Sequence, residues 1–437
     1  MTGVLEVPWS TAEFGLTIRH GESSCGYTVT GLVEPGLRRN PRRAHLLVST
    51  VLGKHIPTDP AAVLGAGHRL GELVADLLGD SASDAVVLGF AETATGLGHC
   101  VADALAAACC LHSTRRRVPG AEVFTGFEEG HSHATFHLLQ PTSGDLFANA
   151  APLVLVDDEI STGATAVDAI RALHRSHPRE RYVVASLVDM RTDEHRRRTA
   201  EVAAELGARI DHVALASGHA VVPDDLVARV SALPEPQLNP VGDRRGEARF
   251  VQAAWPSHVP DGGRHGLLRS DAPAFDAALE AVTDAVTAVR DADRPVIVIG
   301  HEELMYLPLR LAEALAGRGT PTRFQTTTRS PAYVMDVDGY PLRRGFRFTA
   351  PEHIAAEVED EVPRYLYNAQ WPSPTPSCPE LPSRPELVLV IDTPADTDRL
   401  RAPGGLLDVL TAAGEDVLVV VVPAADPAVL RSSREAR

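Results

Sequence analysis

Apolar positions along the chain follow two spacings. Residues 60–79 carry them three or four apart, as a helix with one buried face does, and residues 85–89 form a short continuous run typical of a buried strand. The helical spacing returns at 97–111, and the strand-like run returns at 153–156. The alternation continues with a helix at 165–175, a strand at 181–190 and a helix at 200–207. It predicts an α/β domain with a mostly parallel sheet.

The pattern begins again in the C-terminal part of the chain. A helix is expected at 274–290 and a strand at 295–300, followed by a loop with glutamates and another helix. Residues 236–265, rich in Pro, Gly and Arg, separate the two series and predict a linker. Because 437 residues exceed one ordinary core, we expect two domains, at 1–235 and 266–437.

Short stretches of the first series recur in the second, in the same order. The shared order predicts an ancient duplication, in which the second domain is a degenerate copy of the first. The alternative is that any two α/β domains share strand–Gly–helix runs, and the sequence leaves it open. The matched stretches are 86–105 and 297–315, 112–119 and 326–331, and 153–162 and 387–396.

Two adjacent aspartates, Asp157 and Asp158, follow the apolar run at 153–156. In an open parallel sheet, ligands bind beyond the carboxyl ends of the strands, so both side chains are expected at that edge. Neighbouring carboxylates repel each other, and a ligand or metal can offset the cost. The vicinal hydroxyls of a ribose, with a divalent cation nearby, suit the pair.

A turn of small residues then leads into the next helix. Its backbone N–H groups and hydroxyls, with the positive end of the helix dipole, are suited to a phosphate monoester. Gly163 lets the backbone approach such a ligand closely. An acidic helix cap alone explains one aspartate but not the whole arrangement. The sequence therefore predicts a ribose 5-phosphate site, whose phosphate-binding residues are Ser161, Thr162, Gly163, Ala164 and Thr165.

Composition and charge limit the binding partners and the cellular location that the sequence allows. The net charge of −17 disfavours general binding to nucleic acid, and no apolar run is long enough to cross a membrane. The N-terminal residues lack the pattern of a secretory signal, and the five cysteines show no Cys-x-x-Cys spacing, so we expect a cytoplasmic protein without structural zinc. We expect Cys109 and Cys110 to lie buried in a helix. Lys54 is the only lysine, so arginine and histidine supply the other cations.

The run VLVDDEISTGAT resembles the signature of type I phosphoribosyltransferases, which bind 5-phosphoribosyl-1-diphosphate (PRPP). More narrowly, the chain is similar to orotate-type bacterial members with a C-terminal domain named for a Thr-Arg-Ser-Pro (TRSP) motif, here Thr328 to Pro331. Such proteins are associated with tellurium-resistance gene neighbourhoods. The resemblance implies a type I phosphoribosyltransferase fold followed by a second, Rossmann-like α/β domain. One departure is Thr50, where the family pattern has a lysine; Lys54 remains.

The resemblance also implies the rest of a transfer site. Mg²⁺ is expected at Asp157 and Asp158, since it suits hard oxygen ligands. The loop Ala91-Glu92-Thr93 takes the place of the diphosphate loop, with Glu92 orienting a metal-bound water; the alternative is a plain strand–helix turn. Lys54 and Arg329 are further candidates for binding diphosphate or acceptor.

The stretch 112–144 is expected to be a long loop that closes over PRPP as a lid. Arg115, Arg116 and Arg117 are its candidate cations, because arginine binds diphosphate in bidentate fashion; a solvated basic run is the alternative. His131 and His133 alternate on this segment and could orient the base or assist the leaving group. The alternative is a pair of surface histidines, and a metal site lacks a third ligand.

The expected function is Mg²⁺-dependent transfer of ribose 5-phosphate from PRPP to a nucleobase-like acceptor, with release of diphosphate. Two alternatives stay open: a PRPP-sensing regulator without turnover, and the reverse, nucleotide-cleaving reaction. The C-terminal series keeps one aspartate, Asp392, lacks the phosphate-binding turn and has Pro394 there, so it is not expected to bind PRPP. Either a homodimer or an intrachain pseudo-dimer would complete the site.

Overall fold

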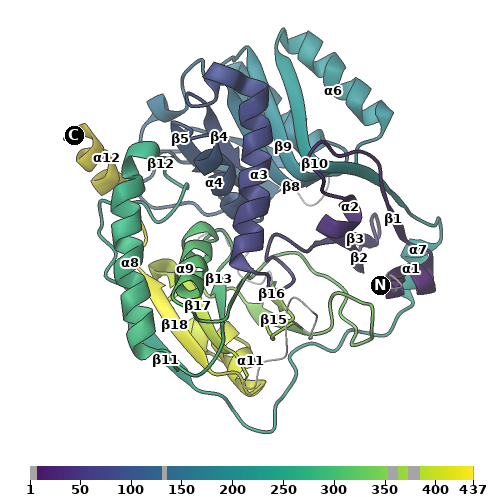
Figure 1. The fold of residues 1–437 in the computed structure, drawn as a ribbon, viewed down its shortest axis with the longest axis vertical. Helices are drawn as coiled ribbons and strands as arrows, with labels where there is room; N and C mark the ends of the chain where they lie inside the picture. The colour runs from purple at the N-terminus through teal and green to yellow at the C-terminus, as the bar shows by residue number, and fades with distance from the viewer. Residues whose placement is uncertain (1–6, 130–134, 353–362, 373–383, 437) are drawn as a thin grey trace.

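The computed structural model describes residues 7–129, 135–352, 363–372 and 384–436. Two α/β halves, each built on its own sheet, lie one above the other in Figure 1. The N-terminal helix α1 and the C-terminal helix α12 lie on opposite sides of the molecule. The helices are α1 Trp9–Phe14, α2 Val29–Leu32, α3 Pro60–Leu78, α4 Thr95–Ala104, α5 Ala164–Ser176, α6 Asp193–Leu206, α7 Leu226–Ser231, α8 Ala272–Val289, α9 Tyr306–Gly317, α10 Asp398–Arg401, α11 Leu406–Ala412 and α12 Pro427–Glu435.

The first half is built on a seven-stranded sheet in the order β1-β10-β9-β8-β4-β5-β12. The five inner strands are parallel, and β1 and β12 are antiparallel at the edges. The inner strands are continuous apolar runs because helices cover both faces, α3 and α4 on one and α5 on the other. The strands are β1 Thr17–His20, β4 Val86–Gly89, β5 Cys109–His112, β8 Leu153–Ile160, β9 Arg181–Asp189, β10 Arg209–Val221 and β12 Leu267–Leu268.

The second half is built on a five-stranded parallel sheet in the order β11-β18-β17-β13-β14. Helices α8 and α9 cover one face, and α10 and α11 the other. Three two-stranded hairpins complete the chain: β2 with β3, β6 with β7, and β15 with β16. The strands are β11 Ala248–Gln252, β13 Val296–Gly300, β14 Thr322–Thr326, β17 Glu386–Asp392, β18 Val417–Val422, and in the hairpins β2 Val33–Leu37, β3 His45–Ser49, β6 Thr125–Glu129, β7 Thr135–Leu139, β15 Gly345–Thr349 and β16 Pro363–Tyr367.

The two sheets share one topology over four strands. In chain order, β4, β5, β8 and β9 of the first half correspond to β13, β14, β17 and β18 of the second, and each set lies in the same spatial order. In each half a hairpin follows the second of these strands and precedes the third. This agreement supports the duplication expected from the sequence. The fifth strands differ, because β10 follows its set along the chain whereas β11 precedes its set.

Three expectations from the sequence need correction. Cys109 and Cys110 are buried, as expected, but they lie on strand β5, since the preceding helix ends at Ala104. The stretch expected as a linker contains β11, which pairs with β18 in the second sheet. The stretch expected as a long loop forms the β6–β7 hairpin, in which the buried rings of Phe127 and His137 stack 4.8 Å apart.

The two halves are packed together. Strand β12, which follows the first half in sequence, pairs with β5 of the first sheet. Val63 and Leu64 of α3 and Cys100 of α4 belong to the same buried apolar cluster as the core of the second half. The halves therefore share part of one core, which fixes them relative to each other.

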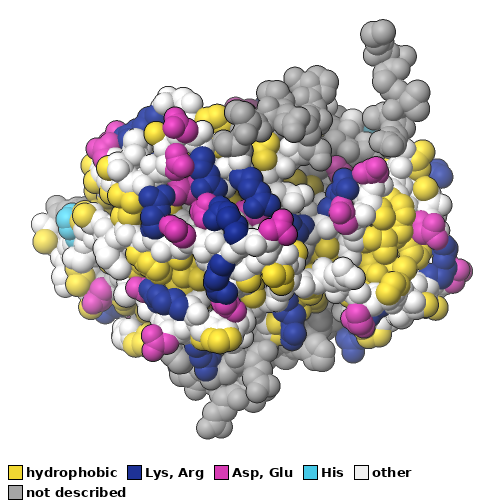
Figure 2. Space-filling view, turned by 90° about the horizontal axis from the view of Figure 1, so that it is seen from below, with side chains coloured by type: hydrophobic (Ala, Val, Ile, Leu, Met, Phe, Trp, Pro, Cys, Tyr) yellow, Lys and Arg dark blue, Asp and Glu magenta, His cyan; other side chains and the backbone are white. Residues whose placement is uncertain are grey.

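On the molecular face seen from below, arginine and lysine side chains lie next to aspartates and glutamates (Figure 2). Opposite charges are thus interspersed on this face, although the chain as a whole carries −17. Among the helices of the described ranges, none is both long and apolar enough to span a membrane.

Candidate functional site

The twin aspartates lie near the end of β8, at the carboxyl edge of the first sheet. The strand runs four residues further than its apolar core, to Ile160, so both acids are part of it. The Asp158 backbone N–H donates to the Asp157 side chain at 2.9 Å. Asp158 also accepts a hydrogen bond from the Thr93 hydroxyl at 3.3 Å and lies 3.7 Å from the Lys54 ammonium. The acids are therefore half-buried beside a cation and a hydroxyl donor.

The turn after β8 leads directly into helix α5. Gly163 precedes the first helical residue with φ +81°, a backbone conformation that glycine adopts at little cost. The Thr162 hydroxyl accepts from the Ala164 N–H at 3.3 Å. N–H groups in the first turn of a helix have no partner within the helix, and they point at the space in front of it. An anion in front of this turn would therefore meet these N–H groups and lie close to the two aspartates.

The loop between β4 and α4 forms the next wall. The Ala91–Glu92 peptide bond is cis, and the Ala91 N–H donates to the Ser113 hydroxyl at 2.9 Å. Glu92 is 5% exposed, and its carboxylate accepts hydrogen bonds from the Thr328 hydroxyl and from the Arg329 N–H. Glu92 therefore holds the TRSP motif of the second half, a role that the sequence did not indicate.

These elements enclose one open cavity of about 480 Å³. Every predicted site residue in the described ranges except Arg116 and Arg117 lines it, so the structure brings together residues from both halves. The cavity is lined by Arg38, Arg39, Asn40, Arg43, Leu46, Leu47, Lys54, Phe90, Ala91, Glu92, Thr93, Arg115, Asp157, Asp158, Glu159, Ile160, Ser161, Thr162, Gly163, Ala164, Thr165, Ala166, Arg329, Ser330 and Pro331.

Arg329 is the contribution of the second half to this cavity. Its guanidinium donates to the Glu302 carboxylate, at 2.8 Å from Nη2 and 3.2 Å from Nε, and lies 3.7 Å from Glu92. Although burial alone would lower it, the pKa of Arg329 is raised, chiefly by Glu302. The side chain is thus a fixed cation at the rim of the first-half site.

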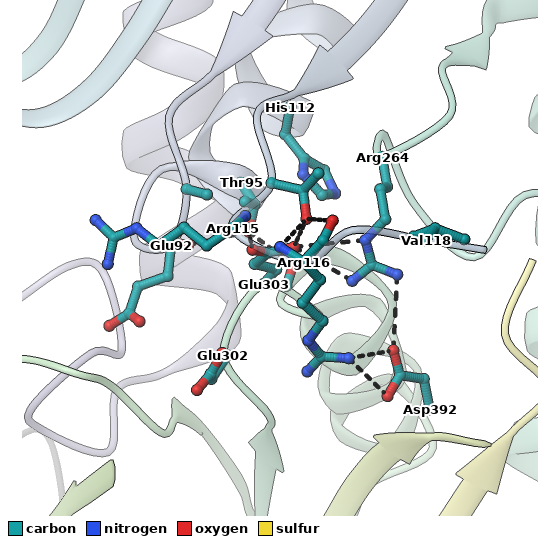
Figure 3. A network of polar contacts seen from close by, with 12 residues as sticks. Glu92, Thr95, His112, Arg115, Arg116, Val118, Arg264, Glu302, Glu303 and Asp392 are labelled. Carbon is teal, nitrogen blue, oxygen red and sulfur yellow. Dashed lines mark hydrogen bonds and ion pairs between the residues drawn. The ribbon is translucent and has the colours of Figure 1, made fainter. Parts of the chain in front are cut away.

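Arg116 does not line the cavity, contrary to the expectation from the sequence. Its guanidinium pairs with Asp392 at 2.8 Å and with Glu352 at 3.2 Å, both in the second half. Figure 3 shows Arg116 and Arg264 converging on Asp392, the aspartate that survives in the second series. Arg116 is therefore part of the junction between the halves.

Arg115, next to it, does line the cavity. The two histidines predicted for the lid, His131 and His133, lie outside the described residues.

The cavity also includes arginines that sequence analysis missed. Arg38, Arg39 and Arg43 come from the β2–β3 hairpin, where Arg43 forms an ion pair with Glu159 of β8. Burial, together with the positive charges of Arg43 and Arg38, lowers the pKa of His45 to about 4, so His45 is neutral near pH 7. The run RRNPRR at 38–43 is the sequence signal that could have pointed to this wall.

Two family models match the chain. Residues 32–219 match the model described as phosphoribosyl transferase, and residues 261–410 match the TRSP domain C-terminal to it. Together they cover well over half of the sequence. No curated protein sequence matches the chain at a significant level.

Two of the solved structures that resemble the chain are phosphoribosyltransferases. One is the APRTase from Giardia lamblia complexed with 9-deazaadenine, with 18% identity and a TM-score of 0.32, covering 42% of this chain and 93% of that one. Another is adenine phosphoribosyl transferase from Trypanosoma brucei with AMP, pyrophosphate and ribose-5-phosphate, with 12% identity and a TM-score of 0.32, covering 46% and 86%.

Proposed function

Because the chain belongs to the phosphoribosyl transferase family and carries that family's TRSP domain, we propose that it transfers ribose 5-phosphate from PRPP to a nitrogenous base and releases diphosphate. The observation that carries this proposal is the convergence of three elements on one cavity: the twin aspartates of β8, the turn before α5 and the loop after β4. Each suits one part of PRPP, namely the ribose hydroxyls, the 5′-phosphate and the diphosphate.

The ribose 5-phosphate end is assigned to β8 and α5. Asp157 and Asp158 accept hydrogen bonds from the ribose hydroxyls, and the N–H groups after Gly163 bind the phosphate. The helix dipole adds favourable charge at the phosphate. This assignment is supported by the positions of the turn and the acids along the same wall.

The diphosphate end is assigned to the loop after β4 and to three cations from different elements. Lys54, Arg115 and Arg329 all line the cavity. Bond breaking at C1 leaves negative charge on the departing diphosphate, and fixed cations favour that charge as it develops. Arginine adds bidentate geometry that lysine lacks. Enclosure between the two halves would limit water, which competes with the base for the ribosyl group.

The donor set at β8 suits Mg²⁺. This ion takes hard oxygen ligands and is held in many sites by one or two carboxylates together with substrate phosphates. Asp157 and Asp158 supply such carboxylates, and both are half-buried at the cavity. They would hold the ion, which when bound would neutralise charge on the diphosphate and orient it.

The test is to incubate the protein with PRPP, Mg²⁺ and a panel of purine, pyrimidine and pyridine bases, and to measure diphosphate release. We expect release with at least one base, and roughly a 100-fold loss or more in Asp158→Asn, since a charged contact to the substrate is removed. Asp168→Asn, on α5 but outside the cavity lining, is the matched control and should retain activity.

Other outcomes separate the alternatives. Calorimetric binding of PRPP without release of diphosphate for any base would favour sensing over turnover. Formation of PRPP from a nucleotide and diphosphate, with no forward reaction, would favour the reverse direction. A protein that neither binds PRPP nor releases diphosphate would refute the proposal.

A further inference from the structure

The junction between the halves makes one set of contacts twice. In the first set, the Thr328 hydroxyl and the Arg329 N–H of the second half donate to Glu92 of the first. In the second set, the Thr114 hydroxyl and the Arg115 N–H of the first half donate to Glu303 of the second, each at 2.7 Å. The two halves thus meet as the subunits of a symmetric dimer do, with equivalent residues exchanged.

The equivalence extends one residue inward and identifies the counterpart of Ala91. The Ala91 N–H donates to the Ser113 hydroxyl at 2.9 Å, and the Glu302 N–H donates to the Thr327 hydroxyl at 3.0 Å. Glu302 therefore occupies, in the second half, the place that Ala91 occupies in the diphosphate loop of the first. A buried carboxylate there would repel a diphosphate, so this loop has lost that use.

Glu302 instead holds two arginines. It is fully buried and has φ +49°, the left-handed region that a residue with a side chain seldom adopts. One carboxylate oxygen accepts from Arg329 at 2.8 Å, and the other accepts from Arg364, which is itself fully buried. A buried acid with a strained backbone persists only where the surrounding contacts, here two guanidinium groups, hold it in that conformation.

We propose that Glu302 is a positioning residue for the transfer reaction: it fixes the Arg329 guanidinium at the cavity, with Arg364 as the second cation that makes a buried carboxylate tolerable there. This inference rests on the proposed function. The second half thus supports the site on the first half with Glu302, a residue of the loop that no longer suits diphosphate.

The charge balance agrees with this role. Burial alone would raise the pKa of Glu302, but Arg329 and Arg364 outweigh burial, so its pKa is lowered and the carboxylate is ionised. Replacing it by an amide would remove one of the acids that interact with the buried Arg364, and it would free Arg329 to adopt other rotamers.

The test compares Glu302→Gln, Arg329→Ala and the double variant. We expect Glu302→Gln to raise the KM for PRPP roughly 10- to 100-fold, the loss typical of a charge-assisted hydrogen bond, with little change in the KM for the base. In the Arg329→Ala background the same change should add little, because Glu302 acts through Arg329. Calorimetric Kd values for PRPP report the same comparison without turnover.

Glu415→Gln is the control. Glu415 is a buried acid of the second half that pairs with Arg344 at 2.8 Å, and neither residue lines the cavity. It should retain wild-type affinity for PRPP. Thermal unfolding checks that each variant is folded, and Glu302→Asp, which keeps the charge on a shorter stem, replaces Glu302→Gln if the latter is not.

Three outcomes would overturn the inference. One is an unchanged affinity of Glu302→Gln, or of Glu302→Asp in its place, for PRPP. Another is an equal further loss when the change is made in Arg329→Ala, which would show an effect independent of Arg329. The third is an equal effect on the KM values of PRPP and base. A wild-type protein that does not bind PRPP would instead remove the proposed function, and the inference with it.

Discussion

Replacing Glu92 by alanine tests how the loop after β4 depends on the second half. The Glu92 carboxylate is the acceptor for the Thr328 hydroxyl and the Arg329 N–H, at 2.7 Å for the latter. Thr328 is fully buried, so leaving its O–H donor without an acceptor costs about 1–3 kcal/mol, and the half-buried Arg329 amide adds about 1 kcal/mol. We therefore expect Glu92→Ala to lower the free energy of unfolding by about 2–4 kcal/mol.

The same change should weaken PRPP binding, because Arg329 loses one of its two acids. Urea unfolding followed by circular dichroism measures the first effect, and calorimetric titration with PRPP measures the second. Glu92→Gln keeps an acceptor oxygen and should lose less stability, about 1 kcal/mol. The comparison of the two variants separates the hydrogen bonds from the charge.

A different role for Glu92 would give a different result. If Glu92 instead orients a metal-bound water, as the sequence suggested, both variants should unfold like the wild type and their activity should depend steeply on Mg²⁺. A change in unfolding free energy within about 0.5 kcal/mol, the scatter of a neutral surface substitution, would show that these hydrogen bonds do not stabilise the protein.

Two more predictions concern the phosphate turn and acid pH. Gly163→Ala should weaken PRPP binding and cost about 1–3 kcal/mol of stability, because φ is +81° and a new Cβ would lie 3.1 Å from the Arg191 side chain. Gly207→Ala is the control for calorimetric titration with PRPP, since Gly207 has φ +62° and no atom within 4 Å of a new Cβ. Equal PRPP affinity in the two variants would contradict the prediction. Burial lowers the pKa values of His112 and His265 to about 4, so stability should be fully present above about pH 6.5 and fall towards pH 4, by about 3 kcal/mol for each histidine. Unfolding by urea at pH 7, 5.5 and 4.5 measures the loss, and a flat profile would contradict it.

Much of the fold was predictable from local patterns. Continuous apolar runs marked the inner strands β4, β8, β9 and β13, because a strand covered on both faces needs apolar residues throughout. The family matches confirm the resemblance that rested on residues 154–165, and residues 157–165 of that run line the cavity.

Partners far apart in sequence could not be predicted. Glu92 and Arg329 lie 237 residues apart, so nothing near Glu92 indicated that it binds the TRSP motif. Arg116 and Arg115 look alike in sequence, but their directions at the end of β5 send one to Asp392 and the other to the cavity. The predicted helix at 97–111 was also too long, since α4 ends at Ala104. Apolar spacing alone could not show this, because the buried strand β5 is as apolar as the end of a buried helix.

The repeated contacts at the junction have a consequence for how such a protein can change. In a homodimer each substitution appears in both subunits, so a glutamate in place of Ala91 would spoil both sites at once. If the halves arose by duplication, they are encoded separately, so the loop after β13 could gain Glu302 as a partner of Arg329 while the loop after β4 kept Ala91. Because the two halves are joined covalently, dilution cannot separate them, and their association does not depend on the protein concentration.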